Sequence, residues 1–193
     1  MMKFRFFLIL FSLGLLCFSQ NEQEREHRIK KSQFPIEAVD FFSENIKDVK
    51  KIRYYKEVDT AQTTYSVKFK KDRLNYHITF DKKNALQTIG FRVKEIDLPS
   101  DTYLKIESYL TSRFDTFKIR RIFQQYSISK ERTENQVLKD AFQNLMLQTT
   151  TYRFLISVRD NGERKKYEAL FDAEGNLKNI RAALPANYDR VLY

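Results

Sequence analysis

One short pattern occurs twice in this chain, at residues 76–89 and again at residues 167–180. The two copies, YHITFDKKNALQTI and YEALFDAEGNLKNI, share Tyr, Phe, Asp, Leu and Ile at matching positions, and Asn84 stands where the second copy has Gly175. Asn and Gly are the residues that most readily adopt a left-handed backbone conformation. An alternating strand followed by Asp, two free positions and such a residue predicts a β-hairpin with a type I turn and a G1 bulge. The chain is therefore expected to contain two copies of one supersecondary unit.

The first unit is expected at residues 34–95. Pro35 suits the first turn of a helix, and Val39, Phe42 and Ile46 follow at spacings that place them on one helical face. Apolar and polar residues then alternate in four short runs, the pattern of strands that are covered on one face. The apolar residues of these runs are Ile52 and Tyr54; Tyr65, Val67 and Phe69; Leu74, Tyr76, Ile78 and Phe80; and Ile89, Phe91 and Val93.

The second unit, at residues 96–184, repeats this order with one addition. Pro99 opens a helix, strands follow, and an extra helix is expected at about 133–147, where Thr133 and Gln136 form a capping box. The fold class is therefore α+β: two tandem units of a helix followed by a four-stranded antiparallel meander, with an extra helix inserted in the second unit. Each helix is expected to lie across the apolar face of its sheet.

Residues 1–19 are predicted to be a signal peptide of bacterial type. Lys3 and Arg5 precede an apolar stretch, and Cys17 and Ser19 place small residues at the −3 and −1 positions of a cleavage site. The protein is then exported, periplasmic or secreted, with no stable membrane span after cleavage. An uncleaved anchor and a lipid anchor on Cys17 remain alternatives.

The segments outside the two units are expected to carry little structure. Residues 20–33 are polar and charge-dense, which favours a flexible lead or an exposed helix, and residues 185–193 are expected to form a short irregular tail.

Cysteine usage and charge limit the classes of function. The only cysteine lies in the predicted signal, so the mature chain has no disulfide, thiol nucleophile or cysteine-based metal site. The formal charge of +10 falls to +8 once Lys3 and Arg5 are removed. A basic surface favours acidic partners, an unknown protein or an anionic polymer of the envelope. Nucleic acid is a poor candidate outside the cytoplasm, and simple solvation of the surface is the alternative.

The sequence predicts no enzyme, no cofactor and no metal site. Nucleophile elbows, phosphate-binding loops and metal-ligand motifs are missing. Strand alternation places His77 on the polar face of its strand, as a satisfied surface histidine. Asp81 and Asp172 occupy the same place in the two turns, where an Asp side chain binds the backbone two residues on. With Asn84 and Gly175 they are interpreted as structural turn residues.

The sheet face opposite the helices is the candidate binding surface. It is somewhat basic and includes two leucines that a purely solvated face does not require, although the inserted helix could cover them instead. The residues proposed for this face are Lys68, His77, Arg92, Arg153, Leu155 and Leu170.

Two tandem units of helix and meander, each with a Phe-Asp-x-x-Gly/Asn-x-Leu turn, behind a signal peptide resemble the PepSY-like family. Members of that family are compared in fold with the β-lactamase-inhibitor protein (BLIP). The resemblance implies an exported, non-enzymatic module that binds another molecule or acts in an inhibitor-like way. The inserted helix departs from the basic unit, and no stretch matches an inhibitory loop, so inhibition does not carry over. The alternative function is a structural or assembly component of the cell envelope with no small-molecule site.

Overall fold

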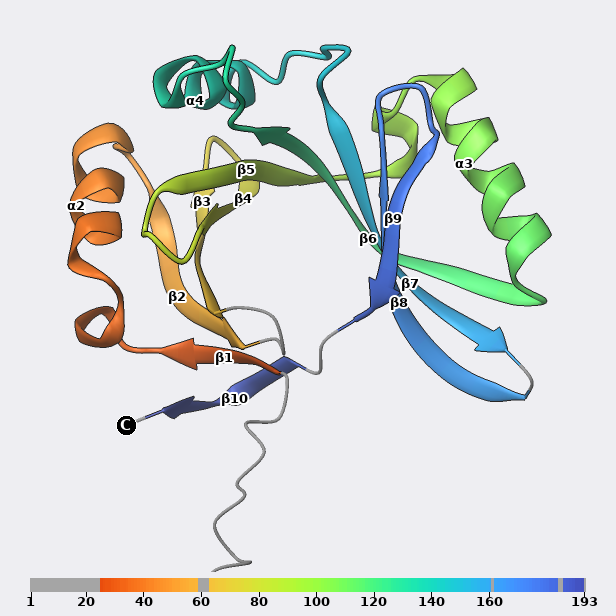
Figure 1. Ribbon diagram of the computed structural model, residues 1–193, viewed down its shortest axis with the longest axis horizontal. Helices are drawn as coiled ribbons and strands as arrows, with labels where there is room; N and C mark the ends of the chain where they lie inside the picture. Colours follow the sequence, from red (N-terminus) through yellow and green to blue (C-terminus); the bar gives the residue numbers. More distant parts are fainter. Residues whose placement is uncertain (1–24, 59–62, 161, 184–185, 193) are drawn as a thin grey trace, which may run out of the picture.

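A single curved sheet of ten strands forms the body of the molecule (Figure 1). The computed structural model describes residues 25–58, 63–160, 162–183 and 186–192. Neighbouring strands follow the order β10-β1-β2-β3-β4-β5-β6-β7-β8-β9, antiparallel throughout except for β10, which lies parallel to β1. The strands are β1 (Arg25–Ile29), β2 (Lys50–Val58), β3 (Thr63–Lys71), β4 (Leu74–Phe80), β5 (Leu86–Val93), β6 (Thr116–Ser127), β7 (Thr151–Asp160), β8 (Glu163–Phe171), β9 (Leu177–Ala182) and β10 (Ala186–Leu192).

Three α-helices occur in the described part of the chain, and all three pack on the same face of the sheet. They are α2 (Ile36–Asn45), α3 (Ser100–Arg113) and α4 (Glu134–Phe142); short 3-10 turns, η2 (Lys31–Gln33) and η3 (Glu95–Asp97), precede the first two. Aromatic pairs join each helix or its end to a strand: Phe42 to Phe69, Phe142 to Tyr76, and Phe114 to Tyr167. In Figure 1, α2 and α3 lie at opposite sides of the molecule.

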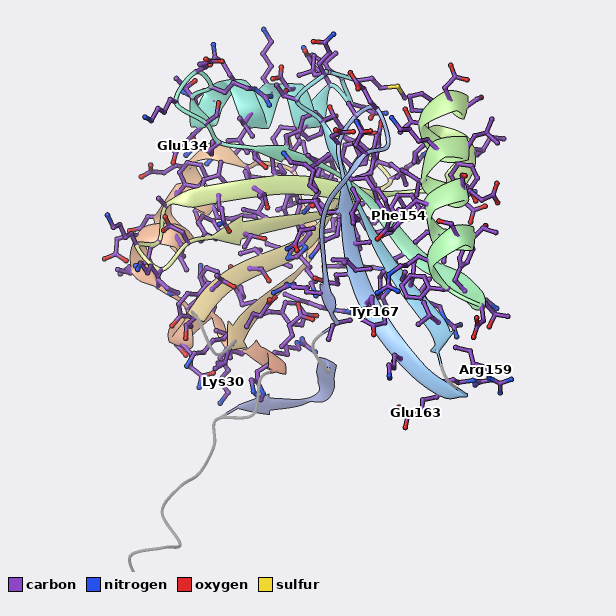
Figure 2. The ribbon with its side chains drawn as sticks, turned by 45° about the vertical axis from the view of Figure 1, so that its right-hand side comes forward. Lys30, Glu134, Phe154, Arg159, Glu163 and Tyr167 are labelled. Carbon is purple, nitrogen blue, oxygen red and sulfur yellow. The ribbon has the colours of Figure 1, made fainter. Side chains whose placement is uncertain are left out.

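The core follows from the alternation in the sequence. Tyr76, Ile78 and Phe80 of β4 are buried on the helix-covered face. Phe154 and Ile156 of β7 are buried on the same face. Each buried side chain of this size stabilises the fold by about 1.5–3 kcal/mol. Arg159 and Glu163, by contrast, lie at the far end of the β7–β8 hairpin, away from the core (Figure 2).

The prediction of two tandem helix-plus-meander units is wrong. Residues Thr88 to Val93 of β5 pair with Ser127 to Ile122 of β6, so the strands that would have ended the two units form one continuous antiparallel sheet. The edge strand of a sheet exposes unpaired backbone donors and acceptors. Pairing β5 directly with β6 removes the two sheet edges that separate units would have exposed. The fold is mostly β, with helices on one side.

The lead and the tail also differ from the prediction. Within the lead, Arg25–Ile29 forms β1, antiparallel to β2, and in the tail Ala186–Leu192 forms β10 beside β1. Main-chain hydrogen bonds need no apolar alternation, so the polar sequence gave no sign of either strand. The predicted signal peptide, residues 1–19, lies outside the described residues.

The inserted helix begins where the capping box placed it. The Thr133 side chain accepts from the Gln136 backbone N–H, and the Gln136 side chain accepts from the Thr133 backbone N–H. The α-helix ends at Phe142, earlier than predicted. Its buried residues Val137, Leu138 and Ala141 join the main core, so α4 covers the helix-bearing face and not Leu155 or Leu170.

Curvature turns the face opposite the helices into a concave surface, hereafter the concave face. Arg181 on β9 and Glu57 on β2 form an ion pair with 3.0 Å between Nη2 and Oε1, although β3 to β8 separate their strands in the sheet. Strand twist accumulates across a wide sheet and brings its distant parts together in this way. None of the described helices has both the length and the apolar content needed to cross a membrane.

Candidate functional site

A cavity of about 470 Å³ occupies the middle of the concave face and is called here the central cavity. Four of the six residues predicted for the binding face, Lys68, His77, Arg153 and Leu155, line it. Arg92 lines a neighbouring hollow, and Leu170 is half-buried on β8 outside the lining of both. Strands at both ends of the sheet contribute, from Glu26 on β1 to Arg181 on β9.

The central cavity carries more cationic than anionic side chains. Its lining contains three glutamates and six cationic side chains, together with the apolar side chains of Phe123 and Leu155. The charged residues are Glu26, Glu57, Glu168, Lys68, Arg121, Arg153, Arg164, Lys166 and Arg181.

Each of the three glutamates is held by a cation. Glu26 forms an ion pair with Lys68, whose ammonium lies 4.1 Å from the centre of the Tyr55 ring. Arg181 lies between Glu57 and Glu168, 3.0 Å from each. Burial raises the pKa of the Glu57 carboxyl, against the opposing effect of Arg181. Burial likewise lowers the pKa of the Lys68 ammonium, although Glu26 acts in the opposite direction.

His77 and Arg153 form the centre of the site. Nη2 of Arg153 lies 2.8 Å from Nδ1 of His77, and the guanidinium lies 4.8 Å from the centre of the Phe123 ring. A guanidinium can only donate, so Nδ1 accepts and the ring proton is assigned to Nε2. Burial, and then the charges of Arg153 and Lys68, hold the pKa of His77 well below its usual value, which agrees with a neutral ring.

Two donors at this centre have no hydrogen-bond partner among the described residues. They are Nε2 of His77 and Nε of Arg153, and both atoms are buried. Only 8% of the His77 surface is exposed. Buried polar groups are nearly always paired, so two such atoms in one cavity are an unusual feature.

The prediction that His77 is a satisfied surface histidine is wrong. Alternation placed it correctly on the face away from the helices, but curvature folds that face inward and buries the ring. The sequence reasoning also missed Glu26, Glu57 and Arg181. No local pattern could have found the last two, which are 124 positions apart in the chain.

A second hollow, of about 390 Å³, adjoins the central cavity on the same face. His77, Lys68, Arg121 and Phe123 line both. Its other cations are Lys51, Arg53, Lys70 and Arg92, and no acidic residue lines it. Arg92 and Arg121 make no ion pair with any described residue. The concave face therefore offers cationic groups that can pair with an acidic ligand.

The four predicted turn residues lie away from this face, in the β4–β5 and β8–β9 turns. Oδ1 of Asp81 accepts from the backbone N–H groups of Lys83 and Ala85, and Oδ1 of Asp172 accepts from those of Glu174 and Asn176. Asn84 and Gly175 have positive φ, 65° and 84°.

The arrangement suits binding more readily than acid/base chemistry. A neutral histidine whose Nδ1 is occupied by Arg153 has only the Nε2–H donor left, whereas a general base must accept a proton. Within the described ranges, no group of His, Cys, Asp and Glu is placed to hold a metal ion.

No protein-family model matches the chain, and no curated protein does, so membership of the PepSY-like family is not confirmed. Several solved structures are similar. A DUF2874 family protein from Bacteroides ovatus has 12% identity and a TM-score of 0.49, covering 80% of this chain and 91% of that one. A BLIP-like protein from Bacteroides fragilis has 11% identity and a TM-score of 0.46, covering 81% and 91%. A Bacteroides eggerthii protein proposed to be periplasmic has 12% identity and a TM-score of 0.49, covering 77% and 88%. We therefore infer function from the residues of the concave face.

Proposed function

We propose that this chain is an exported, non-enzymatic binding module whose concave face takes an acidic segment of a partner protein. The observation that carries the proposal is the excess of cations around the two adjoining hollows, of which Arg92 and Arg121 have no ion pair among the described residues. Charge complementarity of this kind steers association and fixes the orientation of the partner.

A protein fits this lining better than a uniformly charged polymer does. Tyr55, Phe123 and Leu155 line the same two hollows as the cations, and aromatic residues with arginine are typical of protein interfaces. Glu57 and Glu168 share the single guanidinium of Arg181, so two carboxylates in the central cavity divide one positive charge, which disfavours the regularly spaced charges of a polyanion. A protein segment with separate acidic side chains can avoid them.

Site-specific photocrosslinking in an envelope extract tests the proposal. A photoreactive phenylalanine analogue replaces Leu155 in the central cavity or, as the matched control, Leu104 on α3, which is 60% exposed on the opposite side of the sheet. We expect Leu155, and not Leu104, to capture a protease-sensitive species. Soluble poly-glutamate should compete with the capture.

Charge reversal at the second hollow supplies the specificity control. Arg92→Glu combined with Lys68→Glu should reduce capture from Leu155 at least tenfold, since reversal adds like-charge repulsion. Equal capture from both positions, or unchanged capture in the double variant, would remove the concave face as the binding surface. Capture of a protease-resistant species would show that the partner is an anionic polymer and not a protein.

A further inference from the structure

We propose that a third hollow, at the rim of the concave face, holds a large apolar side chain of the partner's acidic segment while the flanking carboxylates pair with arginines. This hollow has a volume of about 660 Å³ and is called here the rim hollow. Residues 73–75, 92–97 and 119–122 line it, so it lies where β4 begins and β5 ends. The inference rests on the proposed function and specifies the composition of the partner segment.

The rim hollow continues the cationic surface of the concave face. Asn75, Arg92 and Arg121 line both the rim hollow and the second hollow, and Arg121 also lines the central cavity. One extended segment can therefore pass from the central cavity to the rim. Arg92 and Arg121 are exposed and make no ion pair with any described residue, so acidic side chains of that segment can reach both.

A β-bulge in β6 directs two successive arginines to the rim hollow. In the pairing of β6 with β7 the register passes from Ile119 to Arg121, so Arg120 has no cross-strand partner on β7. Successive side chains of a regular strand point to opposite faces, yet Arg120 and Arg121 line the same hollow. Bulges re-aim side chains in this way and are frequent beside functional sites.

The β3–β4 turn adds Arg73 to the same hollow at a backbone cost. Asp72 and Arg73 have φ of 45° and 73° and join Lys71 to its cross-strand partner Leu74, as in a two-residue type I′ turn. Gly is favoured at the second position of such a turn, and a bulky residue with positive φ is strained. The Arg73 side chain is exposed and lines the rim hollow. Strain held at a surface hollow points to a function for the side chain.

Apolar groups are accessible between these cations. Ile96 in η3 is 88% exposed, and Leu74 and Ile119, which line the same hollow, are only partly buried. The lining has five cationic side chains against two acidic ones, Glu95 and Asp97. Exposed apolar groups rimmed by polar ones are typical of interaction sites, and covering them contributes to affinity. The segment that fits is acidic and carries a large apolar side chain.

Selection from a displayed library of random dodecapeptides, with the full chain immobilised, tests the rim hollow. We expect the enriched peptides to be acidic and to carry one large apolar side chain among the acidic ones. Selection on Ile96→Ser should retain the acidic preference and lose the apolar one, because only the apolar contact is removed. Ile36→Ser is the matched control and should select the same peptides as the native chain, since Ile36 is 69% exposed at the start of α2, on the helix-bearing side.

Fluorescence anisotropy with the most enriched peptide measures the separate contributions. Ile96→Ser should weaken binding about tenfold, and Ile36→Ser less than about twofold. Arg73→Gly should weaken binding about threefold, the value of one exposed ion pair, whereas Lys82→Gln in the β4–β5 turn should leave binding unchanged. Glycine relieves the positive φ at residue 73, so Arg73→Gly should also raise the urea midpoint of unfolding. That rise separates the loss of binding from a loss of the fold.

Four results would overturn the inference: no enriched peptide, acidic peptides without an apolar preference, equal effects of Ile96→Ser and Ile36→Ser, or equal effects of Arg73→Gly and Lys82→Gln. Any of these together with successful capture from Leu155 rejects the rim hollow and leaves the proposed function standing. Failure of both experiments rejects both.

Discussion

Arg181 and Glu57 join β9 to β2 across the concave face, with 3.0 Å between Nη2 and Oε1. Arg181 also binds Glu168 on the neighbouring β8 at 3.0 Å. One guanidinium thus links two parts of the sheet that lie far apart in strand order.

Replacing Arg181 with Gln should destabilise the fold by about 1–2 kcal/mol. Removing one partner of a buried ion pair costs 3–5 kcal/mol, and the partial exposure of the Arg181 side chain, 40%, reduces that figure. Urea denaturation measures the change in the free energy of unfolding. Arg164→Gln, on an exposed side chain of the same cavity, is the control and should change it by less than about 0.5 kcal/mol. Equal values for the two variants would show that the ion pair does not hold the sheet.

Stability should fall as the pH is lowered through about 6.5, because of His77. Its pKa in the folded state is depressed by burial and by Arg153 and Lys68. Below the ordinary histidine value the unfolded chain therefore binds a proton that the folded chain does not, which favours unfolding. The slope is at most about 1.4 kcal/mol per pH unit for one proton. Urea midpoints at pH 7.5 and 5.5 should differ more for the native chain than for His77→Gln; parallel curves would mean that His77 titrates normally.

Gly175→Ala should cost more stability than Gly162→Ala. Both glycines have positive φ, 84° and 83°, so both substitutions carry a backbone cost of about 1 kcal/mol. A Cβ at Gly162 meets open space, whereas one at Gly175 lies 2.7 Å from the Thr102 carbonyl oxygen on α3 and should add about 1–3 kcal/mol. The difference between the free energies of unfolding of the two variants, measured by thermal or urea denaturation, gives the cost of this contact. Equal losses would indicate that α3 can move away from the turn.

Tyr126→Phe should destabilise the region between β6 and α4 by about 1–2 kcal/mol. The hydroxyl donates to the Leu145 carbonyl oxygen at 2.7 Å and accepts from Nε2 of Gln124 at 2.6 Å. Gln124 is only 1% exposed, so loss of the hydroxyl leaves buried polar groups with fewer partners. Burial raises the pKa of Tyr126 to about 12, so the hydroxyl stays protonated, and remains a donor, into alkaline solution. Hydrogen exchange at the Leu145 region, with urea unfolding, should show the loss; unchanged values would mean that water replaces the hydroxyl.

Alternation located the central strands of the sheet and assigned the faces of β3, β4, β5, β7 and β8. Val67, Ile78 and Phe154 are buried against helices as the pattern predicts, and Lys68 and Arg153 lie on the other face. The period of two is a local property of the chain, since successive side chains point to opposite faces. Capping chemistry at Thr133 is equally local, and it placed the start of α4.

The joining of β5 to β6, the strands β1 and β10, and the inward curvature were not predictable in the same way. Each depends on main-chain pairing between segments far apart in the sequence or on twist accumulated over many strands. The partnership of Glu57 with Arg181 and the burial of His77 both result from that curvature.

The sequence by itself determined which residues lie on each face of β3, β4, β5, β7 and β8, because side-chain alternation requires only the neighbouring residues. Only the tertiary structure decided that the polar face closes around a cavity, since its shape depends on the twist of the whole sheet. It is this closure that buries His77 and half-buries Arg153, whose hydrogen bond to each other joins β4 to β7.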